Sequence, residues 1–145
     1  MNNTYEFKAW DLLLELEGFK SHPYKDSKGI WTIGIGTTVL PNNIKVTKDT
    51  PPITKEQAIE YVTNYMQSVK IFIYKNCKWD YNQNQFDAMC CFLYNTGIYI
   101  DKKYPNTYKA LCTGINITKQ MLSINNKGLL INRRIKEIEL FNKKD

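Results

Sequence analysis

The chain has 145 residues, of which 43% are hydrophobic and 13% aromatic, and its formal net charge is +6. This length suits one cooperative domain, the composition excludes an intrinsically disordered chain, and the absence of repeats excludes a solenoid. No apolar run approaches the length of a membrane span, and Glu6, Asp11 and Glu15 near the start argue against a signal peptide. The positive charge favours a polyanionic partner such as cell wall, anionic lipid or nucleic acid. Because the lysines are scattered, an ordinary soluble surface explains the charge as well.

The first predicted element is a helix over residues 5–17, where apolar side chains recur at helical spacing. Gly18 is suited to end this helix in a left-handed conformation. Glu17 then projects from the last turn, where the negative end of the helix dipole disfavours a charged carboxylate. A carboxyl group that keeps its proton near neutral pH can serve as a general acid.

A β-hairpin is predicted next, running from Tyr24–Asp26 through a glycine-containing turn into a strand over Ile30–Gly36. Alternation assigns Trp31, Ile33 and Ile35 to the core face of that strand. The opposite face loses its bulk after Ile30, which would let a saccharide approach the backbone.

The hairpin folds Asp26 back towards Thr32, and an ionised Asp26 with the Thr32 hydroxyl could position one water molecule for attack. Together with Glu17 this places two carboxylates on separate elements, the arrangement that divides acid and base work on a glycosidic bond. Taken singly, an acidic helix end and a turn aspartate are usually solvated surface. The ordered set is what indicates a sugar-cleaving enzyme.

The remaining elements are mostly helical. Residues 37–53 read as loop and short strand, and Thr54 and Gln57 form a capping box that opens a long helix. Helices are also expected over about 84–94, after Pro105, after Thr118, and over about 131–141. In the last of these, Arg133 and Arg134 are predicted to be structural ion-pair partners of Glu137.

The four cysteines, Cys77, Cys90, Cys91 and Cys112, match no zinc-site spacing. Adjacent cysteines on a helix do not readily bridge each other, so we expect packed, reduced thiols. The sequence contains a single histidine, in the segment before Asp26, so a cysteine nucleophile with a histidine base is not expected.

With these motifs the chain resembles the phage-type lysozymes of glycoside hydrolase family 24. Glu17, Asp26 and Thr32 fit the family order of Glu, eight residues, Asp, five residues, Thr, on a Thr-Ile-Gly-x-Gly strand. Residues 85–97 resemble its Gln-Phe-Asp-Ala-Leu helix ending in Asn-x-Gly, and residues 130–141 its Arg-Arg-x-x-Glu helix. The chain departs from the family at Thr37, where a histidine is common.

The resemblance implies an α+β, lysozyme-like fold in a single domain over residues 1–145. A small N-terminal lobe with a short antiparallel sheet would cover about 15–53. A connecting helix would cover about 54–74, and a helical lobe about 75–145 together with the N-terminal helix.

The resemblance also implies a muramidase that hydrolyses the β-1,4 bond between N-acetylmuramic acid and N-acetylglucosamine in peptidoglycan, with inversion. In that reading Glu17 protonates the leaving oxygen, while Asp26 and Thr32 orient the attacking water. The residues expected to contact the saccharide are Gly34, Gly36 and Asn95.

No metal or organic cofactor is expected, nor a nucleic-acid partner, nor stable membrane insertion. We expect a monomer made in a host bacterial cytoplasm, acting on the cell wall after release with the help of a holin.

Three other functions stay open at this stage. A non-catalytic wall-binding or virion module would keep the fold without activity. A basic nucleic-acid-binding protein would show salt-dependent DNA affinity and no lysis. A lytic transglycosylase would form an anhydro-sugar end and would not need Asp26.

Overall fold

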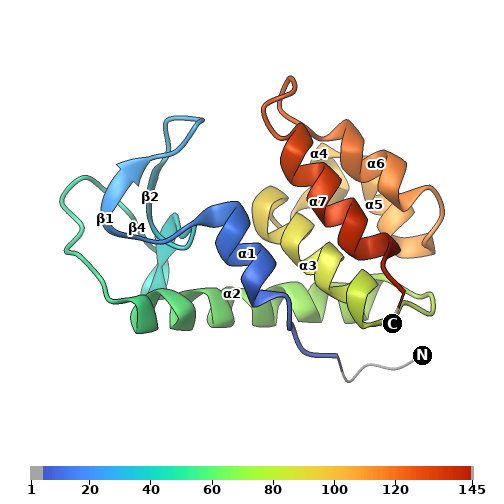
Figure 1. Ribbon diagram of the computed structural model, residues 1–145, viewed down its shortest axis with the longest axis horizontal. Helices are drawn as coiled ribbons and strands as arrows, with labels where there is room; N and C mark the ends of the chain where they lie inside the picture. Colours follow the sequence, from blue (N-terminus) through green and yellow to red (C-terminus); the bar gives the residue numbers. More distant parts are fainter. Residues whose placement is uncertain (1–4, 145) are drawn as a thin grey trace. The chain divides into compact units, whose positions relative to one another are not determined.

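The computed structural model describes residues 5–144 (Figure 1). Its mixed helix and short-sheet content is the expected α+β class, and by contacts the chain divides into two compact units. One unit is Trp10–Tyr65 and the other comprises the rest of the described chain, with α2 contributing to both. In chain order the elements are α1 (Trp10–Glu17), β1 (Lys20–Lys25), β2 (Trp31–Gly34), β3 (Val39–Leu40), a 3-10 turn (Pro41–Asn43), β4 (Ile44–Lys45), α2 (Lys55–Asn76), α3 (Gln83–Thr96), α4 (Ile100–Lys103), α5 (Pro105–Thr113), α6 (Ile117–Ser123) and α7 (Ile131–Asn142).

In the Trp10–Tyr65 unit, β1 and β2 form the predicted antiparallel hairpin, with Tyr24 opposite Thr32. β3 and β4 form a second two-stranded sheet. Ile33 and Ile35 are completely buried, which confirms the predicted core face at these positions. Gly18 lies at φ +70° and its N–H donates to the Leu14 carbonyl over 2.8 Å, so the expected left-handed helix stop is confirmed.

The predicted start of the first helix is wrong, because α1 begins at Trp10 and residues 5–9 are not helical. Tertiary partners take up the backbone groups of this segment. The Tyr5 carbonyl accepts from the Tyr74 hydroxyl over 2.6 Å, and the Lys8 N–H donates to the Asp87 carboxylate over 3.0 Å. Hydrogen bonds to α2 and α3 therefore replace the bonds that a helix would make within itself.

The helical unit is built around α3, which packs against α7. Capping boxes mark two helix starts, that of α2 in the Trp10–Tyr65 unit and that of α3 in the helical unit. The capping box of Thr54 and Gln57 forms as predicted, with bonds of 2.9 and 3.1 Å. A second capping box, between Asn82 and Gln85, opens α3. The expected helices after Pro105 and near Thr118 are α5 and α6, while the four-residue α4 was not predicted.

A buried ionic cluster joins α7 to α3. Arg133 and Arg134 each donate to one oxygen of the Glu137 carboxylate over 2.9 Å, as predicted. Arg134 and Glu137 are fully buried, and the Arg134 guanidinium also donates to Asn95 Oδ1 over 2.7 Å. Burial of these charges is tolerated because each has more than one hydrogen-bond partner.

All four cysteines are free thiols, as expected. Three are buried, and burial raises the pKa of the Cys77 thiol to about 12. A thiol held in its protonated form is a poor nucleophile, so Cys77 is a packing residue.

Asp87 gives the helical unit a specific pH dependence. Its side chain is 3% exposed, and burial raises the pKa of the carboxyl to about 6, although bonds from Lys8 N–H and the Gln83 amide oppose the rise. The native state therefore holds this proton more tightly than the unfolded state. The resulting stabilisation is complete below about pH 4 and is lost as the pH rises through 6.

We expect Asp87→Asn to be more stable than the wild type at pH 7, by up to about 3 kcal/mol, because its amide oxygen keeps both acceptor bonds without a buried charge. The two proteins should converge near pH 3.5. Urea unfolding at pH 3.5, 5 and 7 measures the difference. A difference that does not change with pH would contradict the assignment.

Candidate active site

Glu17 ends α1 with its carboxyl group against the backbone of Gly36, just beyond β2 in the same unit. A Cβ atom built on Gly36 would overlap Glu17 Oε1 and lie 2.9 Å from Glu17 Cδ. Gly36 also lies at φ +75°, a backbone conformation that favours glycine. The missing side chain therefore makes room for the Glu17 carboxyl, a role that the sequence did not reveal.

Asp26 occupies the turn of the β1–β2 hairpin and holds it closed. Its Oδ1 accepts from the N–H groups of Lys28 and Ile30 over 2.8 and 2.9 Å. These bonds are ordinary turn chemistry. Oδ2 receives no hydrogen bond from any residue between 5 and 144, so one oxygen fixes the carboxylate while the other is left to accept from water.

Thr32 lies opposite Tyr24 in the hairpin and is 2% exposed. Its hydroxyl donates to the Ile30 carbonyl over 2.9 Å, so towards a water molecule it can act only as an acceptor. The expected open face is wrong at this point, because both Thr32 and Gly34 are buried. At Gly34 a Cβ would meet Ile53 and Ala58 at 3.0 and 3.1 Å, so close packing explains this glycine.

Tyr24 is a site residue that the sequence reasoning missed. Burial raises the pKa of its phenol, and the negative charges of Glu17 and then Asp26 raise it further. Both carboxylates therefore act electrostatically on this one side chain. The Lys20 ammonium lies 4.9 Å from the Tyr24 ring centre. The signal was available, since Tyr24 precedes Asp26 by only two residues.

Of the six predicted site residues, Glu17, Asp26, Thr32, Gly34 and Gly36 all belong to the Trp10–Tyr65 unit. Asn95 belongs to the helical unit, where its amide oxygen is taken by Arg134. That bond leaves the amide N–H groups of Asn95 as its donors.

Gly36→Ala is expected to lower activity by about 10²-fold, because displacing a catalytic group by roughly an ångström has a cost of that size. It should also lose about 1–2 kcal/mol of stability through its left-handed backbone. Initial rates of wall lysis and urea unfolding measure the two effects.

The matched control is Gly128→Ala, which shares the positive φ but has open space, with Ile131 Cδ1 at 3.8 Å as its nearest contact. It should lose similar stability and keep its activity. Equal rates for the two variants would contradict the role of Gly36 in seating Glu17.

A model of the phage lysozyme family matches residues 14–137, which include both carboxylates, the hairpin and the buried ionic cluster. The chain belongs to the phage lysozyme family. This confirms the resemblance read from the three sequence blocks.

Individual relatives agree with the family match. The endolysin of Salmonella phage P22 is 36% identical over 81 residues, which cover 56% of this chain and 55% of that protein. The matched stretch is thus little more than half the length of that relative. A P22 lysozyme mutant superposes with a TM-score of 0.75 at 27% identity, covering 97% of this chain and all of that structure. The endolysin from Escherichia coli O157:H7 phage FAHEc1 has a TM-score of 0.81 at 26% identity, with 97% and 95% covered.

Between residues 5 and 144, no three His, Cys, Asp or Glu side chains are grouped so that they could hold a metal ion. Over the same part of the chain, every helix is too short or too polar to cross a membrane.

Proposed function

We propose that this chain is an endolysin, a muramidase that hydrolyses the β-1,4 bond between N-acetylmuramic acid and N-acetylglucosamine in bacterial peptidoglycan. The observation that carries the proposal is that one compact unit holds the Glu17 carboxyl against Gly36, just beyond β2, and the Asp26 carboxylate in the β1–β2 turn. Membership of the phage lysozyme family supports it.

In the proposed mechanism Glu17 donates a proton to the glycosidic oxygen as the bond to the anomeric carbon breaks. Asp26 accepts a proton from a water molecule through Oδ2, and the water oxygen bonds to the anomeric carbon. Thr32 accepts the second hydrogen of that water, since its own proton is committed to the Ile30 carbonyl. Gly36 and Asn95 remain proposed saccharide contacts, of which Gly36 acts mainly by seating Glu17, whereas buried Gly34 serves the packing against Ile53 and Ala58.

We propose that the reaction inverts the anomeric carbon, because water attacks directly and no enzyme-bound sugar forms. Inversion needs carboxyl groups about 6.5–9.5 Å apart, whereas retention needs about 5 Å. Nuclear magnetic resonance of the first product formed identifies its anomer. An α-anomer from the β-linked substrate supports inversion, and a β-anomer overturns it.

The reaction class is tested by digesting purified peptidoglycan in heavy-oxygen water and analysing the fragments by mass spectrometry. A hydrolase releases reducing muropeptides that carry one heavy oxygen at the new end. Anhydro ends without that label would instead identify a lytic transglycosylase. Absence of fragments with retained wall binding would identify a non-catalytic wall-binding module.

The proposed setting is synthesis in a host bacterial cytoplasm and release to the wall through a holin, with the protein acting as a monomer.

A further inference from the structure

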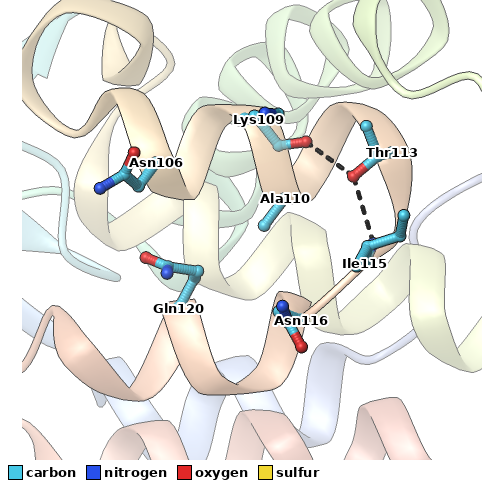
Figure 2. A pocket seen from close by; sticks show the side chains of 7 residues that line it. All are labelled: Asn106, Lys109, Ala110, Thr113, Ile115, Asn116 and Gln120. Carbon is cyan, nitrogen blue, oxygen red and sulfur yellow. Dashed lines mark hydrogen bonds between the residues drawn. The ribbon is translucent and has the colours of Figure 1, made fainter.

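A pocket of about 370 Å³ lies between α5 and α6 in the helical unit (Figure 2). Its volume is at the lower end of the range for small-molecule sites, about 300–1,000 Å³. None of its lining residues is acidic, and none belongs to the site described above. They are Asn106, Lys109, Ala110, Thr113, Ile115, Asn116 and Gln120.

The polar side chains around the pocket have unused hydrogen-bonding groups. Those of Asn106, Lys109 and Asn116 make no hydrogen bond or ion pair with any residue that the structure describes. Asn116 stands at the N-cap of α6, yet its left-handed backbone, at φ 58°, leaves its side chain without a capping bond. Gln120 Oε1 accepts from the Thr107 hydroxyl over 3.2 Å, which leaves the Gln120 amide N–H groups as donors.

The pocket also offers apolar contact. Ala110 is nearly buried and lies between the two helices, while Ile115 is 66% exposed at the rim. A ligand that fits both the amide side chains and the apolar surface of the pocket needs a methyl group beside oxygens that form hydrogen bonds. The acetamido group and hydroxyls of an N-acetylated sugar have this combination.

The positive charge around the pocket favours some N-acetylated sugars over others. Residues 66–145 contain 13 of the 20 basic side chains and only 6 of the 14 acidic ones, whereas residues 10–65 contain 6 basic and 7 acidic. The excess positive charge of the protein therefore belongs to the part of the chain that forms this pocket. Lys109 supplies a cation at the pocket itself, which favours a sugar bearing a carboxylate.

We propose that the α5–α6 pocket is a second, non-catalytic binding site for the carboxylate-bearing N-acetylated sugar of peptidoglycan. The amides bind its acetamido and hydroxyl groups, Ile115 and Ala110 contact the acetamido methyl, and Lys109 binds the carboxylate. The inference rests on the proposed wall substrate. Its consequence is that the helical unit holds the glycan independently of cleavage.

The test uses the full chain with Glu17→Gln, so that binding is measured without cleavage. Co-sedimentation with purified peptidoglycan sacculi gives the affinity of this protein, of a Lys109→Glu version and of a Lys75→Glu version. Lys75 is an exposed lysine on α2 outside the pocket, so the two charge reversals change the net charge equally. We expect Lys109→Glu to weaken binding about five- to tenfold and Lys75→Glu to weaken it less than twofold.

A second measurement locates the ligand directly. Titration with N-acetylmuramic acid should shift the backbone amide resonances of Ala110 and Ile115, and neutral N-acetylglucosamine should shift them less. Equal effects of the two lysine variants, or no shift at these amides, would overturn the pocket assignment. The two proposals can fail independently. If the wild type releases muropeptides but the pocket test fails, only the second binding site is refuted. Pocket-dependent wall binding without muropeptide release would leave the second site standing and refute the muramidase.

Discussion

Glu17→Gln is expected to lower muropeptide release by at least about 10³-fold, because an amide of the same shape cannot donate the proton that the leaving oxygen needs. Glutamine keeps the side-chain volume that packs against Gly36, so the fold should be retained. Initial rates on purified peptidoglycan, with fragments counted by mass spectrometry, measure the effect.

Two controls make this result specific. The thermal unfolding midpoint of Glu17→Gln should stay within a few degrees of the wild type, and sedimentation with sacculi should be unchanged. Near-normal release of reducing fragments by the variant would remove Glu17 from the role of general acid.

Asp26→Asn is expected to lower the rate by about 10²–10⁴-fold, the usual contribution of a general base. The asparagine oxygen can still accept from the Lys28 and Ile30 amides, so the hairpin turn should survive. Only the second oxygen changes, from an acceptor of the water proton to an amide donor. Steady-state rates on purified peptidoglycan measure the loss.

The companion variants separate chemistry from turn structure. Asp26→Ala removes both turn bonds and should lose stability as well as activity, unlike Asp26→Asn. Thr32→Ala should reduce the rate less than Asp26→Asn, since the hydroxyl only orients water. A transglycosylase would tolerate Asp26→Asn, so an unchanged rate would refute the hydrolytic role of Asp26.

The sequence by itself determined the local elements and the order of the chemical groups. The capping box at Thr54 and the left-handed stop at Gly18 are short-range signals, and both reappear in the structure. The pairing of Arg133 and Arg134 with Glu137 was also predictable, because residues three and four apart share a helix face. The family was predicted from three blocks of residues, and the match to the phage lysozyme model confirms it.

Only the tertiary structure decided features that depend on partners far apart in the sequence. Residues 5–9 have a helical pattern, but Asp87 and Tyr74 offer their backbone alternative hydrogen bonds. Gly36 reads as an open strand position until the Glu17 carboxyl is seen to occupy the space. Tyr24 became part of the site because strand pairing and the end of α1 place it near both carboxylates. Spacing along a chain specifies which face a side chain takes, whereas the neighbour that fills the space beside it is specified only by folding.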